Sequence, residues 1–268
     1  MPTGLAAGKL LLDEPAEAVA RLRINNPAKR NALDHDILDA LAEVLPTLDR
    51  GIEVRCVLIG ATGGHFSAGY DIGSISEQRF EREAEALVAH PFHAAIEVLA
   101  AHPWPTLAAI EGDCLGGGLE LAITCDLRAC AAGARLGMPP VKLGLIYGHT
   151  GLRRFLDTIG LTHTCELFLT GANVDSERAR EIGLAQYVVA EDQIERAAVK
   201  LAEQVAANAP LSLRGNKQAI RTLNDNPVLS EAQERELIEL RESCFASEDF
   251  REAITAFRQK RRPRWRGR

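Results

Sequence analysis

The sequence of 268 residues lacks an apolar run of the length that a membrane-spanning helix needs, about 20 residues. It also lacks a basic segment followed by an apolar one at its start, which is the pattern of a secretory signal peptide. We therefore expect a cytoplasmic protein with no membrane partner. Hydrophobic residues make up 46% of the chain and charged residues 25%, the composition of a globular protein with a substantial core.

No two cysteines have the Cys-x-x-Cys spacing of a zinc or redox site. The six cysteines are scattered, mostly in apolar segments, which favours reduced and buried thiols over disulfides: Cys56, Cys114, Cys125, Cys130, Cys165 and Cys244. His90 and His93 have the spacing of two ligands on one helix, but no third ligand accompanies them. We expect no metal site and no redox cofactor.

Two nucleotide-binding motifs are also missing, the phosphate-binding loop ending in Gly-Lys-Ser/Thr and the Gly-x-Gly-x-x-Gly fingerprint. The net charge of −6 argues against nucleic acid as a partner. The C-terminal segment is an exception, because it is rich in basic residues: Arg258, Lys260, Arg261, Arg262, Arg264, Arg266 and Arg268. We expect this segment to be either a solvated tail or an anion-binding element.

The first half of the chain alternates strand and helix signals. Apolar patterns predict strands over residues 19–24, 55–60, 105–110 and 126–131, and helices over 33–48 and 119–124. Strands separated by helices indicate an α/β fold with parallel strands. Helical signals dominate later, over residues 152–159, 162–169, 176–182, 193–208, 211–223, 231–246 and 249–260, with Asp192 and Ser247 as expected N-caps.

Three consecutive glycines, Gly116, Gly117 and Gly118, precede the predicted helix over 119–124. A glycine inside a helix costs about 1 kcal/mol relative to alanine, so the triplet needs a reason. Close packing against a strand is one reason, and backbone N–H groups pointed at an anion are another. A second glycine-bearing loop, over residues 60–71, follows another buried strand. One N–H group from each loop could therefore converge on a single developing oxyanion.

Several motifs, in matching order, resemble the crotonase superfamily, which is the enoyl-CoA hydratase/isomerase family. They are residues 27–33 (PAKRNAL), 66–72 (FSAGYDI), 110–122 (IEGDCLGGGLELA), 125–126, 169–171, 179–184 and 257–263. The resemblance covers roughly residues 10–265 and implies a crotonase-type spiral of ββα units. It divides the chain into a spiral core over residues 1–200 and a C-terminal helical trimerisation region over 201–268.

The resemblance implies an acyl-coenzyme A thioester as substrate and no further cofactor. Its carbonyl oxygen would lie between the N–H groups of Ala68 and Gly117, which would stabilise an enolate. Tyr70, Asp71 and Ile72 are expected to line the substrate site. Other residues would contact coenzyme A, often across a subunit boundary of a homotrimer or a dimer of trimers: Lys29, Arg30 and Lys260 at the phosphates and Phe257 near the adenine.

The pattern departs from that of a two-glutamate hydratase, which needs one carboxylate to activate water and another to protonate the α-carbon. Glu120 meets the first position, but the second falls on Pro140, which exchanges no proton. Residues 138–147 resemble methylmalonyl-CoA decarboxylases, which lack the second glutamate and have a tyrosine at the place of Tyr147. There Tyr147 would orient a substrate carboxylate. The match is incomplete, because Tyr70 stands where those enzymes have a histidine.

Three functions therefore stay open. The sequence favours decarboxylation of a malonyl-type CoA, ahead of hydration of an enoyl-CoA by Glu120 alone. A non-catalytic acyl-CoA-binding protein is the third reading. His65 and His149 lie in the relevant loops, where we expect them at the surface or in the pocket wall, and we expect Asp126 to be structural.

Overall fold

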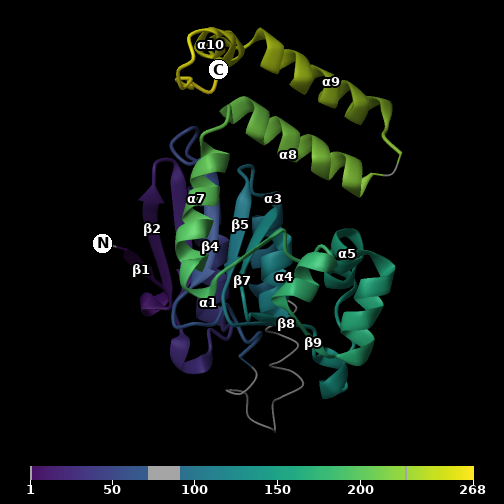
Figure 1. Cartoon of the computed structure of the whole chain (residues 1–268). Coiled ribbons are helices and arrows are strands. Elements are labelled where there is room, and N and C mark those ends of the chain that lie inside the picture. Colours follow the sequence, from purple (N-terminus) through teal and green to yellow (C-terminus); the bar gives the residue numbers. More distant parts are fainter. Residues whose placement is uncertain (1, 72–90, 227) are drawn as a thin grey trace.

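The computed structural model describes residues 2–71, 91–226 and 228–268, and every structural statement below concerns these residues. Ile72 and His90 lie outside them. The main sheet of the described part has the strand order β1-β2-β3-β4-β5-β7-β10 (Figure 1). Its strands are β1 (Thr3–Leu5), β2 (Leu10–Ala16), β3 (Val19–Ile24), β4 (Cys56–Ala61), β5 (Thr106–Ile110), β7 (Leu127–Ala131) and β10 (Tyr187–Val189).

The centre of this sheet is parallel, as the alternation of strands and helices predicts. Strands β3, β4, β5, β7 and β10 pair in parallel, and β1 and β2 add an antiparallel edge. A second, smaller sheet was not predicted. It joins β6 (Asp113–Leu115), β8 (Arg135–Gly137) and β9 (Asn173–Asp175). Strand β6 leads directly into the glycine triplet, so this small sheet fixes where the glycines lie.

Helices pack on both faces of the main sheet, and others lie beyond it. The helices of the described part are α1 (His35–Thr47), α3 (His93–Ala101), α4 (Gly117–Thr124), α5 (His149–Thr170), α6 (Ser176–Glu181), α7 (Ile194–Ala206), α8 (Pro210–Asp225), α9 (Glu231–Ala246) and α10 (Glu248–Arg258). Alternate residues of β4 separate the two faces: Val57 and Ile59 join the core with α1, α3 and α4, whereas Cys56 and Leu58 face α7. Helix α7 buries alanines there, and such small side chains let a helix lie close to a sheet.

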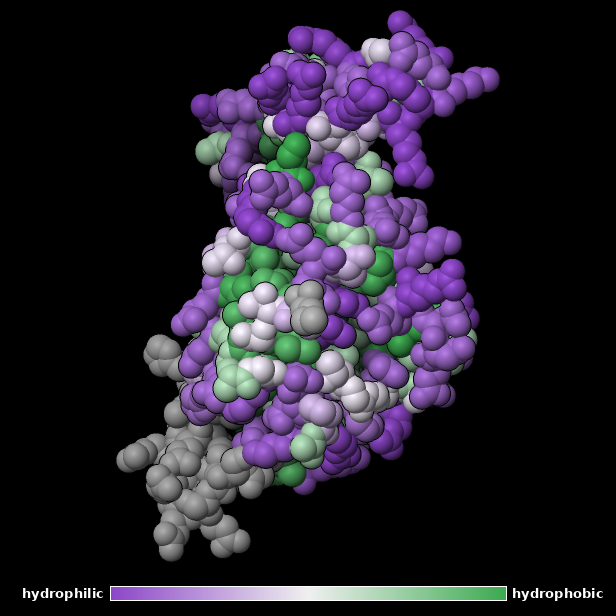
Figure 2. Space-filling model, turned by 90° about the vertical axis from the view of Figure 1, so that its left-hand side faces the viewer, coloured by the Kyte–Doolittle hydropathy of each residue, from purple (hydrophilic) through white to green (hydrophobic). Residues whose placement is uncertain are grey.

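The last three helices form an arm that extends beyond one end of the sheet (Figure 1). Its attachment is electrostatic: Lys217 and Arg221 of α8 pair with Asp126, at 2.7 and 2.9 Å. The Asp126 carboxylate also accepts from the N–H and hydroxyl groups of Thr106. These contacts give Asp126 the structural place that we expected. Figure 2 shows that the upper end of the molecule is mainly hydrophilic on that face, while apolar residues gather over the middle.

Local predictions had mixed outcomes. The helices predicted over 152–159 and 162–169 are confirmed as the two halves of α5, which non-helical angles at Gly160 separate (φ 71°, ψ 174°). Helix α7 begins after Gln193, with no side-chain cap from Asp192. Ser247 does cap α10, because its hydroxyl accepts from the N–H of Phe250. Of the cysteines, Cys165 is exposed and Cys244 is partly exposed, so only the other four are buried.

The basic segment after α10 is not an extended, solvated tail. It folds back on α10, where the buried carboxylate of Asp249 accepts from the N–H groups of Arg266 and Gly267 at 2.7 and 2.9 Å. Arg261 pairs with Glu252 at 2.6 Å. Glu248 of the arm also pairs with Arg266 and Arg268, each at 3.4 Å. No described helix is long and apolar enough to cross a membrane.

Candidate active site

The two glycine-bearing loops lie side by side because strand-like hydrogen bonds join them. The N–H of Ser67 donates to the carbonyl of Asp113 at 3.0 Å, and the N–H of Leu115 donates to the carbonyl of Ser67 at 2.9 Å. At Gly69, φ is +96° and a Cβ would lie only 3.0 Å from the carbonyl oxygen of Leu115. Only glycine therefore fits at this crossing. The crossing brings the segment around Ala68 next to Gly117.

The two backbone amides differ in their present partners. The N–H of Gly117 opens the first turn of α4 and has no acceptor among the residues that the structure describes. The N–H of Ala68 donates to the carbonyl of Arg30 at 2.9 Å. The sequence did not predict this second contact. Gly117 thus presents an available donor at the positive end of a helix, whereas the Ala68 amide is engaged.

Both explanations of the glycine triplet find a place in the structure. A Cβ at Gly118 would lie 2.6 Å from the Cβ of Ser67, so this glycine permits close packing of the two loops. A Cβ at Gly117 would overlap the ring of Tyr70. Gly116 has φ +53°, a conformation that favours glycine. Tyr70 is therefore packed directly on the residue whose amide is available.

Glu120 lies on the first turn of α4, and its buried carboxylate meets two tyrosines. The hydroxyl of Tyr147 donates to Oε2 of Glu120 at 2.5 Å, and the hydroxyls of Tyr70 and Tyr147 are 3.3 Å apart. Burial raises the pKa of Glu120, an effect that the hydrogen bond from Tyr147 opposes. Burial also raises the pKa of both tyrosines, so they stay neutral donors. The sequence proposed these three residues separately, and the fold brings them into one hydrogen-bonded line.

Neighbouring residues hold this line in place. The ring of Phe92 meets Tyr70 edge-on with centroids 4.8 Å apart, and Phe168 lies 5.6 Å from Tyr147. A Cβ at Gly151 would lie 2.6 Å from the Tyr147 ring and 2.7 Å from Oε2 of Glu120. Pro140 is buried at the start of a 3-10 helix, where its carbonyl accepts from the N–H of Leu145 at 3.0 Å. At the position of the missing glutamate the chain thus has a turn that leads to Tyr147.

Comparison with known proteins identifies the family. The sequence model described as Enoyl-CoA hydratase/isomerase matches residues 14–268. The chain belongs to the enoyl-CoA hydratase/isomerase family. The short-chain-enoyl-CoA hydratase of Clostridium acetobutylicum is 33% identical, over 91% of this chain and 92% of the relative. The 2,3-dehydroadipyl-CoA hydratase of Escherichia coli is 32% identical, over 94% of this chain and 96% of the relative.

Solved structures of this enoyl-CoA hydratase/isomerase family share the fold. The crystal structure of the enoyl-CoA hydratase from Bacillus anthracis has a TM-score of 0.88 at 29% identity and covers 97% of this chain and 100% of that chain. The enoyl-CoA hydratase from Mycobacterium tuberculosis has a TM-score of 0.83 at 31% identity, over 97% and 99% of the two chains. The predicted crotonase-type α/β fold with a helical C-terminal region is confirmed.

The cations expected at coenzyme A lie near the two loops of this enoyl-CoA hydratase/isomerase family member. Lys29 pairs with Asp71 at 2.6 Å, so two predicted site residues contact each other. Arg30, 61% exposed at its side chain, lies 3.4 Å from the buried Asp113, which Arg135 also approaches, at 2.6 Å. Arg135 was not predicted from the sequence, because β8 carries no motif that would distinguish it from other surface arginines.

Phe257 and Lys260 do not join the other candidates within one chain. They lie at the end of α10, in the arm, whereas β8 and β9 lie at the opposite end of the molecule (Figure 1). Phe257 is 86% exposed. His65 accepts through Nδ1 from the N–H of Asp113 at 3.1 Å, a loop contact, and His149 opens α5. No group of three possible metal-binding side chains occurs in the described part of the chain.

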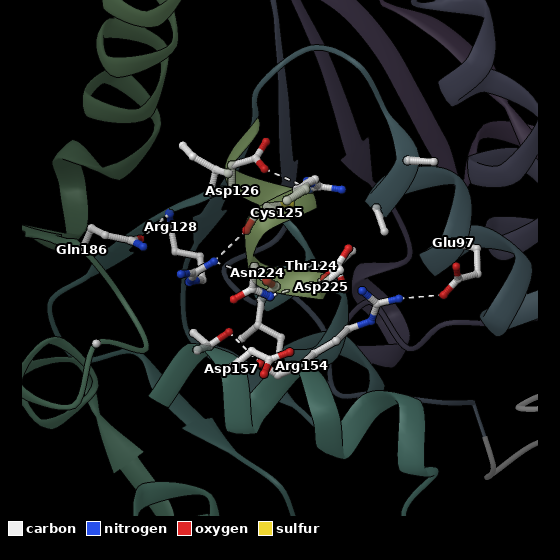
Figure 3. A pocket seen from close by; sticks show the side chains of 17 residues that line it. Glu97, Thr124, Cys125, Asp126, Arg128, Arg154, Asp157, Gln186, Asn224 and Asp225 are labelled. Carbon is white, nitrogen blue, oxygen red and sulfur yellow. Dashed lines mark hydrogen bonds and ion pairs between the residues drawn. The ribbon is translucent and has the colours of Figure 1, made fainter. Parts of the chain in front are cut away.

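Arg154 is a further charged residue that sequence reasoning missed. It comes from α5, one turn after Gly151, and its Nε lies 3.9 Å from Oε1 of Glu120. Its other end pairs with Glu97 of α3 at 2.7 Å (Figure 3). The spacing of Gly151 and Arg154 on one helix was the only signal available, and it needed the position of Glu120 to become meaningful.

Proposed function

We propose that this chain hydrates an enoyl-coenzyme A thioester, with Glu120 as its single catalytic carboxylate. The observation that carries the proposal is the 2.5 Å hydrogen bond from Tyr147 to Oε2 of Glu120. It fixes a buried carboxylate on the same helical turn as the available N–H of Gly117. Oε1 of Glu120 is left to accept a proton from water. The two hydratases named among the relatives support the same reaction class.

In the proposed reaction the thioester carbonyl accepts a hydrogen bond from the N–H of Gly117. Ala68 becomes the second donor if the Arg30 carbonyl releases its N–H when the thioester binds. Glu120 takes a proton from water, the hydroxyl oxygen bonds to the β-carbon, and the π electrons move into the thioester as an enolate. The enolate then takes that proton back from Glu120 onto its α-carbon. One water is added and Glu120 is restored. Removing one such backbone donor typically costs about 10² to 10³ in rate.

In this mechanism Tyr147 orients Glu120, while the position of the second glutamate is taken by Pro140. Pro140 can exchange no proton, but it shapes the turn that brings Tyr147 to Glu120. A tyrosine with a raised pKa holds the carboxylate through a charge-assisted hydrogen bond without adding a second negative charge. A single carboxylate is sufficient because the proton taken from water is the one returned to the α-carbon.

Decarboxylation of a malonyl-type CoA is the second candidate, favoured by Pro140 and by the two tyrosines. Carbon dioxide would leave, its bonding electron pair would enter the thioester as an enolate, and a solvent proton would complete the product. Two features of the site make decarboxylation a weaker candidate than hydration. The hydroxyl of Tyr147 already donates its hydrogen bond to Glu120, and the Glu120 carboxylate would repel a substrate carboxylate.

The coenzyme A moiety would take its phosphate contacts from Lys29 and Arg30. Phe257 and Lys260 are too far along the arm to reach the same ligand within one chain. We therefore propose a homotrimer or a dimer of trimers, in which the arm reaches the site of a neighbouring subunit. Light scattering that shows a stable monomer would contradict this assembly.

The deciding experiment incubates the protein with enoyl-, 3-hydroxyacyl- and malonyl-type CoA thioesters and measures loss of the conjugated enoyl absorbance and release of carbon dioxide. We expect hydration by the wild type and loss of it in Glu120→Gln, with Glu43→Gln on the exposed face of α1 as the matched control. Carbon dioxide without hydration would favour decarboxylation. Turnover of no thioester would leave a non-catalytic acyl-CoA-binding protein.

A further inference from the structure

A cleft of about 750 Å³ opens between α3, α4, α5 and α8, and Arg154 is part of its wall. Figure 3 shows the guanidinium of Arg154 directed toward Glu97, with Thr124 and Asp157 nearby. None of Tyr70, Tyr147 and Gly117 lines this cleft. Arg154 thus belongs to a solvent-accessible wall and at the same time approaches the buried carboxylate of Glu120.

Arg154 approaches Glu97 more closely than it approaches Glu120. Its terminal nitrogen donates to Oε1 of Glu97 at 2.7 Å. Its Nε is buried, has no hydrogen-bond partner in the described part of the chain, and lies 3.9 Å from Oε1 of Glu120. This distance is too long for a hydrogen bond and short enough for a strong electrostatic interaction at a buried site. Arg154 therefore acts on Glu120 by charge, without occupying the oxygen that faces it.

We propose that Arg154, held by Glu97, is a positioning residue that keeps Glu120 ionised and its Oε1 free. The proposal deepens the hydratase function and rests on it, because a general base must be charged before it can accept a proton. A direct hydrogen bond from an arginine would tie up that oxygen. The tether to Glu97 provides the charge at a distance.

Other groups around Glu120 act in both directions. Burial raises its pKa most, and the charge of Glu97 adds to this rise. The hydrogen bond from Tyr147 and the charges of Arg154 and His93 lower it. Tyr70, beyond Tyr147, is neutral. Arg154 is the permanently charged cation in this set, so its removal should favour the protonated form of Glu120.

The test compares pH profiles of kcat/KM for hydration in the wild type, Arg154→Met and Arg154→Lys. An opposite charge within about 4–6 Å typically lowers the pKa of a carboxyl group by about one unit or more. We therefore expect Arg154→Met to lower kcat/KM about tenfold on the acidic limb, because the limb moves to higher pH. Arg154→Lys should restore part of this loss.

Arg153→Met is the matched control, because Arg153 is the adjacent residue and pairs with Asp157 at the surface, 64% exposed at its side chain. It should leave the profile unchanged. If Arg154→Met lowers kcat/KM equally at every pH, or if Arg153→Met moves the limb as Arg154→Met does, the proposal is overturned.

A second readout needs no turnover. The infrared C=O band of protonated Glu120, assigned by its loss in Glu120→Gln, should titrate at higher pH in Arg154→Met than in the wild type. If this band moves but no thioester is hydrated, the hydratase function fails and the electrostatic role of Arg154 stands. If thioesters are hydrated and the band does not move, the role of Arg154 fails and the hydratase function stands.

Discussion

Replacing Gly151 by alanine would place one methyl group between the two groups on which the proposed chemistry depends. The new Cβ would lie 2.6 Å from Cε1 of Tyr147 and 2.7 Å from Oε2 of Glu120. Carbon atoms in real structures do not approach ring carbons so closely, so the ring or the carboxylate must move. Either movement lengthens the 2.5 Å hydrogen bond between them. Gly151→Ala therefore tests this hydrogen bond without deleting either of its partners.

Stabilising and destabilising effects together determine how far Gly151→Ala changes the free energy of unfolding. Alanine gains up to about 1 kcal/mol over glycine in a helix. Overpacking a buried site typically costs about 1–3 kcal/mol, and a hydrogen bond to a charged group contributes about 1.5–3 kcal/mol. We therefore expect Gly151→Ala to lower the free energy of unfolding by about 1.5–5 kcal/mol. Misplacing a catalytic group by about 1 Å costs about 100-fold in rate, so kcat for hydration should fall by that order.

Gly215→Ala is the matched control. Gly215 lies inside α8, and a Cβ there would meet Leu240 at 3.4 Å, an ordinary contact. This variant should realise the helix gain and keep full activity. Chemical denaturation and the hydration assay measure both variants. If Gly151→Ala becomes more stable as Gly215→Ala does and hydrates at the wild-type rate, the argument about Tyr147 and Glu120 is refuted.

Three further predictions follow from buried polar contacts. Tyr147→Phe should lower kcat for hydration at least tenfold and move its acidic limb to higher pH, because burial then raises the pKa of Glu120 with less opposition; an unchanged profile would contradict this. Glu120→Gln should change how stability depends on pH. Because the folded-state pKa of Glu120 is raised, the free energy of unfolding of the wild type should fall as the pH rises through that pKa. Denaturation should therefore show the variant to be more stable than the wild type at alkaline pH and equally stable in acid. Lys217→Met should lower the free energy of unfolding by about 1–3 kcal/mol, because it removes one of the two cations that pair with Asp126, leaving Arg221, and deletes the hydrogen bond to the carbonyl of Trp104. The same change at Lys200, exposed on α7, should cost little.

The sequence predicted the parallel strands and most helices because their apolar residues recur with a clear period. Strands β3, β4, β5 and β7 lie within a residue or so of their predicted positions. The second sheet escaped prediction, because β6, β8 and β9 have three residues each and cannot show a period. Its existence depends on pairing between distant segments, such as Cys114 with Leu136.

The sequence predicted individual residues of the candidate site, but not the hydrogen bonds and charged contacts between them. The motifs singled out Gly117, Glu120 and Tyr147, but the bond between the last two spans 27 residues of sequence and needs the turn at Pro140. The hydrogen bond of the Ala68 amide and the approach of Arg154 are also tertiary contacts. The return of the basic C-terminal segment onto α10 was not predicted, because its acidic partners Glu248, Asp249 and Glu252 lie on that helix and a charge count cannot pair them.

The interruption of α5 at Gly160 divides the helix into two halves that contact different parts of the protein. The half before it delivers Gly151 and Arg154 to the buried glutamate, and the half after it runs on to Thr170, beside the small sheet. Because the backbone angles at Gly160 are not helical, the direction of the outer half is not a straight continuation of the inner half. A scaffold divided in this way can reshape its rim for new thioesters while the setting of the carboxylate is inherited unchanged.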